Sequence, residues 1–331
     1  MKSRFQIWLS GMLVLGLLAG AVSLLSGCRK KSGSASPVTG SRLNASDRTK
    51  NLPLSQLIPP PGNRTGKREM EVELQVKDDY MYGTLAGQYG RLQVAVKYLT
   101  KALKAQPDFI DAHHNLGLAY YKLGRQDDAV AEWRQALRLD PTFAETYYNL
   151  GIFLMDNGRK DDGIKLFQEC IKHDSYHLKS RYALGKIAQD AGNYQEAIRH
   201  YKSYQQRDKG DLKVHMALGE TYLLAGMIES SQREFESAAK IDEKNPMIHY
   251  QLGVAYHRSN RIAEAIHEYQ RATELAPDLI DGFVNLGDLH IHRREYAKAL
   301  RAFNSALGID SRNAYARKRA GEMEKKLLET K

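Results

Sequence analysis

The eleven histidines are the side chains of this sequence best suited to general-base catalysis or metal binding. Either chemistry would require several such groups at spacings that bring them together. His290 and His292 are two residues apart, which would place them on different faces of a helix. No His-Glu-x-x-His motif and no cluster of cysteine and histidine occurs in the chain. We therefore expect a protein that is not an enzyme, with no metal and no small-molecule substrate.

Cys28 stands directly after an apolar run from about Trp8 to Leu25, and two basic residues precede that run. The run is long enough to cross a bilayer, and it fits either a membrane anchor or a signal sequence. Its last residues, Leu25-Ser26-Gly27-Cys28, are similar to the lipobox of bacterial lipoproteins. That resemblance implies a signal peptide over residues 1–27 and a covalent N-terminal lipid on Cys28, with no other cofactor. The alternative is a transmembrane helix with an incidental cysteine at its end.

The residue after Cys28 is Arg29, which bears on where a lipoprotein is sorted. In enterobacterial sorting, an aspartate at this place retains a lipoprotein in the inner membrane. The resemblance therefore implies a lipid-anchored protein of the cell envelope, at the outer membrane and facing the periplasm. Because several acyl chains anchor a protein stably, the membrane is an expected partner through the lipid.

The elements that would position these residues follow a repeat of 34 residues. A glycine recurs at this interval seven times: Gly83, Gly117, Gly151, Gly185, Gly219, Gly253 and Gly287. A fixed period of 34 is typical of a solenoid of helix-turn-helix pairs, in which each pair buries its apolar face against its neighbours. Such a solenoid leaves a long concave surface exposed, which usually binds other proteins and rarely does chemistry.

The rest of the repeat supports this prediction when each glycine is numbered as position 8. Leucine precedes the glycine in six repeats, small residues predominate at positions 20 and 27, and a large residue stands at position 24. Pro107, Pro141 and Pro277 stand at position 32, where they would end the second helix. This pattern resembles the tetratricopeptide repeat (TPR) over residues 76–313. The resemblance implies an all-α fold, a right-handed TPR solenoid of seven helix-turn-helix repeats plus a C-terminal capping helix.

Several positions depart from the repeat. The turn residue at position 15 is glycine in five repeats but Asn260 and Arg294 in the last two. Cys170 replaces a small residue at position 27, so we expect a buried core thiol; no second cysteine is left for an intramolecular disulfide. Tyr204 also stands at position 27, and Ala188 stands at position 11 of the same repeat, where a large residue is usual. We predict that these two have traded places, with Tyr204 largely buried against Ala188.

The chain after the last repeat, residues 314–331, is predicted to be a capping helix. One face of it would carry apolar residues at i, i+4, i+7 and i+11, namely Ala316, Ala320, Met323 and Leu327. The other face is charged, as the solvent-facing side of a solenoid end must be.

Residues 28–75 carry no repeat pattern and are rich in proline, glycine and serine. This composition is typical of a disordered tether. Its one apolar cluster comprises Leu52, Leu54, Leu57 and Ile58. The cluster fits either a short docking segment or a stretch of linker whose apolar residues have no structural role, and we favour the second interpretation.

The net charge of +10 is concentrated next to the expected anchor. Nine basic and two acidic residues lie between Arg29 and Met70, so the repeat array is close to neutral. A neutral array and export to the periplasm argue against nucleic acid as a partner. The basic tether fits either a contact with anionic headgroups or a spacer alone.

The TPR resemblance also implies where a partner would bind, because positions 2, 5, 9 and 12 of the first helices line the concave groove in that family. The candidate groove-binding residues are Tyr80, His114, Tyr121, Tyr148, Met155, Tyr182, Met216 and Tyr250. Aromatic and methionine side chains suit an amphipathic helix or an extended peptide. The lysine and asparagine set with which some TPR domains clamp a C-terminal carboxylate is absent. The alternative is that the aromatic residues at position 5 simply pack against a neighbouring helix.

The lipobox and the repeats together resemble bacterial outer-membrane TPR lipoproteins. The resemblance implies a membrane-tethered periplasmic scaffold that binds a protein or peptide partner in an envelope complex. The first choice is a pilotin-like role in type IV pilus biogenesis, in which the protein assists assembly of a pilus or secretion secretin. The alternative is an accessory adaptor that regulates peptidoglycan or polysaccharide enzymes.

Overall fold

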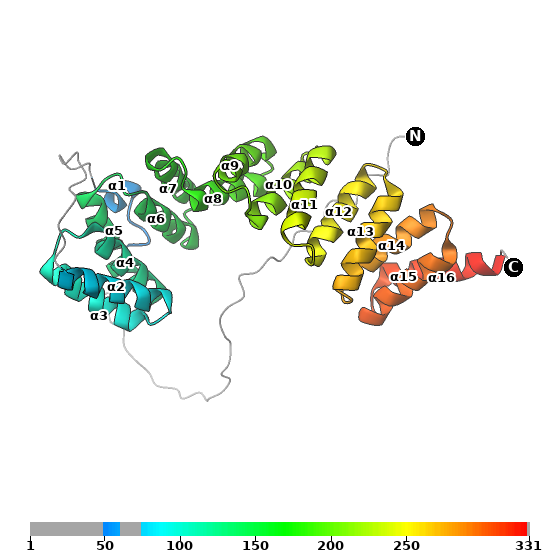
Figure 1. Cartoon of the computed structure of the whole chain (residues 1–331), viewed down its shortest axis with the longest axis horizontal. Coiled ribbons are helices and arrows are strands. Elements are labelled where there is room, and N and C mark those ends of the chain that lie inside the picture. Colours follow the sequence, from blue (N-terminus) through cyan, green and yellow to red (C-terminus); the bar gives the residue numbers. More distant parts are fainter. Residues whose placement is uncertain (1–48, 60–73, 330–331) are drawn as a thin grey trace, which may run out of the picture. The chain divides into compact units, whose positions relative to one another are not determined.

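The computed structural model describes residues 49–59 and 74–329, and every regular element within them is a helix. Seven helical hairpins follow one another along the chain (Figure 1). Their first helices are α2 (Leu74–Gln88), α4 (Ile110–Lys122), α6 (Ala144–Asp156), α8 (Leu178–Asp190), α10 (Leu212–Leu224), α12 (Pro246–Arg258) and α14 (Ile280–His292). Their second helices are α3 (Leu92–Ala105), α5 (Gln126–Leu139), α7 (Lys160–His173), α9 (Tyr194–Arg207), α11 (Ile228–Ile241), α13 (Ile262–Leu275) and α15 (Tyr296–Ile309). The all-α prediction with seven hairpins is confirmed; residues 1–27, Cys28 and most of the expected tether lie outside the described residues.

The turn inside each hairpin is set by one residue with a left-handed backbone. Gly124 adopts φ +75° between α4 and α5, which costs a glycine little because it has no Cβ. Asn260 and Arg294 take the same place in the last two repeats, both with φ 59°. Asparagine tolerates this region, whereas an arginine there is held by the packing of the surrounding helices.

The two helices of a hairpin approach closely because position 8 has no side chain. A Cβ at Gly117 would lie 2.6 Å from the ring of Trp133, which is fully buried between α4 and α5. The small residues at position 20, such as Ala129, are also completely inaccessible. Large residues at position 24 therefore fill the space that small residues at positions 8 and 20 leave, as the sequence predicted.

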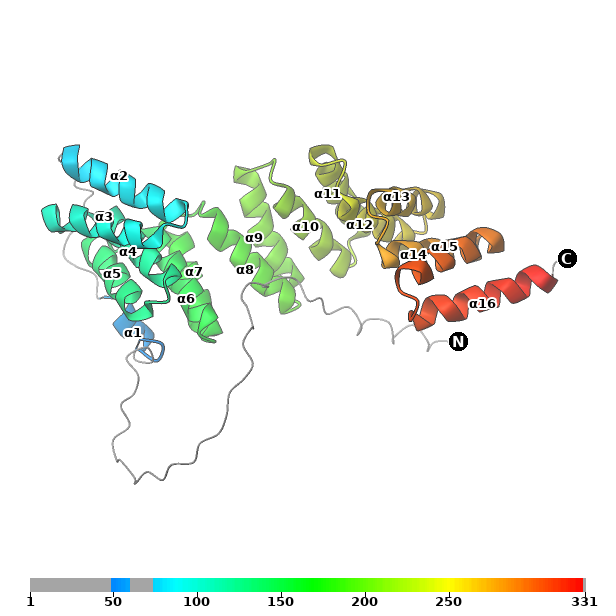
Figure 2. The same cartoon turned by 90° about the horizontal axis from the view of Figure 1, so that it is seen from below.

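Successive hairpins pack on each other, because each second helix lies against the first helix of the next repeat (Figures 1 and 2). The last hairpin is covered by α16 (Ala314–Glu329), on which Ala316, Ala320 and Met323 are buried and Leu327 is half-buried. The predicted capping helix is thus confirmed. Its role is to remove the apolar side of α15 from water.

Residues 49–59 are not a loose apolar stretch, and our interpretation of them is wrong. The short helix α1 (Leu54–Leu57) packs beside α5, and Leu57 is fully buried in the core cluster of repeats 2 and 3 (Figures 1 and 2). Leu52, Leu54 and Ile58 pack against the same cluster. The alternative interpretation, a docking segment, is the one that the structure supports.

The predicted packing of Tyr204 against the surroundings of Ala188 is confirmed in part, because the side chain is half-buried. Its ring does pack on the cluster that contains Ala188, and it meets the ring of Tyr182 edge-on at 6.3 Å. The hydroxyl donates a hydrogen bond to Asp211, at the start of α10, which draws the ring to the margin of the cluster. The fully buried ring of this repeat is that of Tyr201.

Among the described residues, none of the helices combines the length and the apolar character that crossing a bilayer would require. The apolar run from Trp8 to Leu25 lies outside these residues, so its predicted role as a signal peptide stays a prediction.

Candidate functional site

The predicted groove residues all lie on first helices, which neighbour one another along the array. We call the surface formed by positions 5, 9 and 12 of α2, α4, α6, α8, α10, α12 and α14 the inner face. Seven of the eight candidates are half-buried, and His114 is buried. The half-buried candidates are Tyr80, Tyr121, Tyr148, Met155, Tyr182, Met216 and Tyr250.

The tyrosines at position 5 rest on aromatic residues of their own repeat. The ring of Tyr148 lies 5.6 Å from that of Phe167 and 5.2 Å from that of His177. The ring of Tyr250 lies 5.7 Å from that of Tyr269. One side of each ring therefore contributes to the packing of the hairpin, and the rest of the ring remains at the inner face. The packing interpretation accounts for the buried part of each side chain, and the binding interpretation concerns the part that stays exposed.

The hydroxyl groups of two position-5 tyrosines, Tyr80 and Tyr250, are hydrogen-bonded to the next repeat. The Asn115 amide donates to the Tyr80 hydroxyl at 3.1 Å, and the Asn285 amide donates to the Tyr250 hydroxyl at 3.4 Å. Both pairs are separated by 35 residues. Sequence reasoning missed these asparagines, although an asparagine one residue beyond the 34-residue interval was a signal that could have found them.

The imidazole of His114, another inner-face residue, is held in its neutral form by burial and by two hydrogen bonds. The Asn149 amide donates to His114 Nε2 at 3.2 Å, so this nitrogen carries the lone pair, and the Nδ1–H donates to the Thr146 hydroxyl at 3.0 Å. Burial, assisted by the positive charge of Lys179, lowers the pKa of His114 to about 4. A neutral, doubly hydrogen-bonded imidazole is a structural part of the inner face rather than a base available to a ligand.

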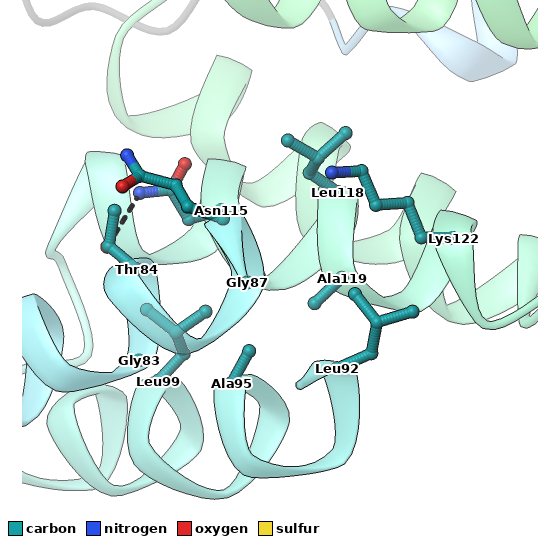
Figure 3. Close-up of a pocket in the computed structure, with 11 residues that line it drawn as sticks. Gly83, Thr84, Gly87, Leu92, Ala95, Leu99, Asn115, Leu118, Ala119 and Lys122 are labelled. Carbon is teal, nitrogen blue, oxygen red and sulfur yellow. Dashed lines mark hydrogen bonds between the residues drawn. The ribbon is translucent and has the colours of Figure 1, made fainter. Parts of the chain in front are cut away.

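A pocket of about 140 Å³ opens between α2, α3 and α4 (Figure 3). Leu99 and Gly87 create it, because the other repeats have an aromatic ring at position 24 and a larger residue than glycine at position 12. Thr84 and Asn115, hydrogen-bonded to each other at 3.1 Å, form one part of its wall. Leu118 and Lys122 of α4 form another. The lining residues are Gly83, Thr84, Gly87, Gln88, Leu92, Ala95, Leu99, Asn115, Leu118, Ala119 and Lys122.

This pocket can accept a small apolar side chain, with a hydrogen-bonding amide and an ammonium group at its walls. It lies at the inner face, since Thr84 and Leu118 occupy position 9 of their helices. Sequence reasoning did not find this pocket, because Gly87 and Leu99 lie on different helices and only the folded hairpin places them around the same space.

Histidines at position 4 of three repeats make the same polar contacts away from the inner face. His113 contacts Glu132 at 2.6 Å through Nδ1 and the Pro107 carbonyl at 2.8 Å through Nε2. His215 and His249 make the corresponding pairs with Glu234 and Glu268. The contacts to a carbonyl group six residues earlier join each of these histidines to the end of the preceding repeat.

Cys170 is a fully buried core thiol, as predicted. Burial raises its pKa to about 11, which keeps the thiol protonated and unreactive. Within the described residues, no group of three or more histidine, cysteine, aspartate or glutamate side chains is arranged to hold a metal ion. Cys28, the predicted lipid carrier, lies outside these residues.

Sequence profiles of known repeat families match most of the array. Profiles described as TPR repeat match residues 88–124 and 119–158, and profiles described as tetratricopeptide repeat match residues 144–177, 188–249 and 246–279. Together they cover more than half of the chain. The chain belongs to the tetratricopeptide repeat family. None of the proteins with curated functions matches this TPR chain.

Solved TPR structures share the fold at low sequence identity. The C-terminal part of a TPR repeat-containing protein from Cytophaga hutchinsonii is 18% identical, with a TM-score of 0.61 over 72% of this chain and 98% of that one. YrrB, a TPR protein with an unusual peptide-binding site, is 18% identical, with a TM-score of 0.51 over 56% of this chain and 95% of that one.

PilF of Pseudomonas aeruginosa is 16% identical, with a TM-score of 0.51 over 64% of this chain and 97% of that one. At these identities the likeness shows the TPR solenoid and nothing finer. TPR proteins are scaffolds for protein–protein interaction.

Proposed function

We propose that this chain is a lipid-anchored, non-enzymatic scaffold of the cell envelope that binds a protein or peptide along its inner face. The observation that carries the proposal is the row of half-exposed aromatic and methionine side chains on the first helices, together with the adjoining pocket at Leu99. Exposed rings that are already held by packing lose little freedom on binding, so they make efficient anchors for a partner.

The inner face can be tested without disturbing the hairpin packing. Replacing Tyr148 or Tyr250 would also remove a ring from the core, so loss of binding could reflect misfolding. Leu118 and Ile152, at position 9, are half-buried on the same face. We expect Leu118→Glu with Ile152→Glu to abolish capture of the partner from detergent-solubilised envelopes, with helical content unchanged by circular dichroism.

A matched control places the same charges on second helices. Ala131 of α5 and Gln168 of α7 are both exposed. The variant Ala131→Glu with Gln168→Glu should capture the partner as the unchanged protein does. Retained capture by the inner-face variant, or equal loss in both variants, would contradict binding at the inner face.

The anchor is proposed from the lipobox resemblance at Cys28 and its following residue, Arg29. Cys28→Ser should prevent incorporation of a fatty-acid analogue during metabolic labelling, and it should release the protein from the outer-membrane fraction. Unchanged labelling would contradict lipidation, and labelled protein in the inner membrane would contradict the sorting proposal alone.

Within this proposal, a pilotin-like role in assembling a pilus or secretion secretin is the first choice. The combination of a lipid anchor, a position at the outer membrane and a TPR array supports it. The alternative is an adaptor for peptidoglycan or polysaccharide enzymes. Capture with the native, detergent-solubilised protein separates the two: secretin or pilus subunits favour the first, and wall hydrolases or synthases favour the second.

A further inference from the structure

The segment formed by residues 49–59 docks on repeats 2 and 3, at a surface distinct from the inner face. Leu57 is fully buried and Pro59 is buried, although both belong to a stretch that precedes the first hairpin. Their receptor is the cluster built by α5, α6 and α7, which includes Val130, Leu137 and Leu154. We call the receptor surface the α5–α7 groove.

Equivalent positions in other repeats show what the segment covers. Leu137, at position 28 of repeat 2, is 1% exposed, whereas Leu103 and Leu307 at the same position of repeats 1 and 7 are half-buried. Val130, at position 21, is 1% exposed, but Ile198 and Ile266 at the same position of repeats 4 and 6 are also buried without such a segment. The comparison therefore rests on Leu137, which lies in the same cluster as Leu57 and is more buried than the leucines at its position in repeats 1 and 7.

Polar contacts hold the backbone of the segment. The Arg159 guanidinium donates to the carbonyl oxygens of Lys50, at 3.3 Å, and of Leu52. The Thr49 hydroxyl donates to the Asp127 carboxylate at the start of α5. Contacts to carbonyl groups do not depend on side-chain identity, so they fix the path of a peptide, while the pocket for Leu57 selects its sequence.

The ion pair of Arg159 with Asp162 is also less exposed than the equivalent ion pair in the preceding repeat. Arg159 and Asp162 form an ion pair at 2.6 Å, with side chains 21% and 26% exposed. The equivalent pair one repeat earlier, Arg125 and Asp128, lies at 2.7 Å with 49% and 47% exposed. Both pairs join residues three apart at the start of a second helix, and the Arg159 guanidinium also contacts the backbone of the docked segment.

We infer that the α5–α7 groove is a peptide-binding site for short segments of the type Leu-x-Leu-x-x-Leu-Ile-Pro, and that residues 52–59 of the chain itself occupy it. The occupant is joined to α2 by a short connection, which gives it an effective concentration on the order of millimolar. A separate peptide of the same chemistry is therefore excluded while the segment is docked, and it binds once the segment is displaced.

Docking also changes where the array is attached to its anchor. An extended chain from Cys28 to Thr49 spans at most about 75 Å, whereas one from Cys28 to Leu74 would span at most about 165 Å. This consequence rests on the proposed lipidation of Cys28, but the groove itself does not.

The test uses the full chain in detergent and a fluorescently labelled synthetic peptide of residues 49–59. In the variant Leu57→Asp the intrinsic segment should leave the groove, because a carboxylate cannot be buried there unpaired. We expect the peptide to bind this variant at least about tenfold more tightly than the unchanged chain, measured by fluorescence anisotropy. A peptide that carries Leu57→Asp should not bind either protein.

Two matched variants identify the groove. Ser55 is exposed on α1, so Ser55→Asp adds the same charge without undocking and should leave the groove closed to the peptide. Adding Arg159→Ala to Leu57→Asp should weaken peptide binding about tenfold, whereas adding Arg125→Ala should not. Absence of binding to a folded Leu57→Asp chain, or equal binding to that chain and the unchanged one, would overturn the inference.

A second measurement decides the matter if Leu57→Asp fails to fold. The amides of Gln56, Leu57 and Ile58 donate to carbonyl groups within the docked segment, so they should be protected from hydrogen exchange in the unchanged chain. Protection should be lost in Arg159→Ala and kept in Arg125→Ala. Free exchange of all three amides in the unchanged chain would show that the segment is not bound, and it would overturn the inference.

Discussion

Two neighbouring junctions follow the same sequence pattern but differ in packing. The junction of repeats 1 and 2 has an open pocket, whereas a segment from outside the repeats covers the junction of repeats 2 and 3. At the first, Leu99 and Gly87 replace bulkier residues and leave a pocket of about 140 Å³. At the second, Leu57 enters from a segment outside the repeats and is fully buried beside Leu154. The same repeat thus leaves space open at one junction and packs against another part of the chain at the other.

The open pocket and the filled groove also lie on different surfaces of the array. The open pocket lies at the inner face, next to the half-exposed rings of the first helices. The filled groove lies beside second helices, and its occupant comes from within the chain. A partner that approaches the array therefore meets a vacant site on one surface and an occupied site on the other.

The largest expected effect comes from adding a Cβ at position 8 inside the hairpins of repeats 2 and 1. Gly117→Ala would place it 2.6 Å from Trp133, in a core with no room to adjust, and should lower the free energy of unfolding by about 3 kcal/mol. Gly83→Ala meets Leu99 at 2.7 Å, but that side chain can move into the adjoining pocket, so we expect about 1 kcal/mol. Urea denaturation followed by circular dichroism measures both; equal losses would mean that the pocket gives no relief.

A smaller effect distinguishes the two equivalent arginines. Arg159→Ala removes the donor to the Lys50 and Leu52 carbonyls and should destabilise the docked segment by about 1–2 kcal/mol. Arg125→Ala loses an exposed ion pair and a stacking contact with Tyr120, for less than about 1 kcal/mol, and should leave the segment docked. Hydrogen exchange of the Leu57 amide reports docking directly; a similar change in both variants would contradict the assigned role of Arg159.

Filling the open pocket should stabilise the protein slightly. Leu99→Phe installs the aromatic residue that six repeats have at position 24, and we expect a gain of up to about 1 kcal/mol in the free energy of unfolding. Leu99→Ala enlarges the pocket and should cost about 2–3 kcal/mol. A loss of stability in Leu99→Phe would show that α2 and α3 cannot accept a ring at this place.

The smallest effect is the contribution of His113, in repeat 2, to the pH dependence of the free energy of unfolding. Burial disfavours the charged form of His113, but its hydrogen bonds to Glu132 and to the Pro107 carbonyl outweigh burial and raise its pKa. The stabilisation is therefore complete below about pH 6.5 and is lost as the pH rises through the raised pKa. His113→Tyr, which copies Tyr147 of repeat 3, should remove this dependence. Urea denaturation should show that the unchanged protein gains up to about 1 kcal/mol more stability over the variant at pH 6 than at pH 8.5. The comparison with the variant is needed because the lowered pKa of His114 gives an opposite pH dependence that both proteins share.

Local signals made the helices predictable to within a few residues. From α4 onwards, each first helix begins where the 34-residue numbering places position 1, because the turn residue at position 15 and the glycine at position 8 act within one repeat. The burial of Cys170 and of the α16 face followed from the same numbering. These predictions needed no knowledge of which repeat contacts which distant segment.

The candidate site was predicted less completely. The numbering identified Tyr148 and Tyr250, but their half-buried state depends on the rings of Phe167 and Tyr269 beneath them. The pocket forms because Gly87 and Leu99 are both smaller than the residues at their positions in the other repeats and both line the same space. Tyr204 is less buried than a traded position would require, because its hydroxyl group donates a hydrogen bond to Asp211.

The sequence by itself determined the solenoid, since a 34-residue period with glycine, small residues and one large residue at constant positions permits only one kind of hairpin. Tertiary structure alone decided that Leu57 would be buried on repeats 2 and 3 while the space beside Leu99 stayed open. The physical reason is that periodicity reports contacts between neighbours in the repeat. The docking of a segment from outside it depends on shape and on groups such as Arg159 that meet only in the folded chain.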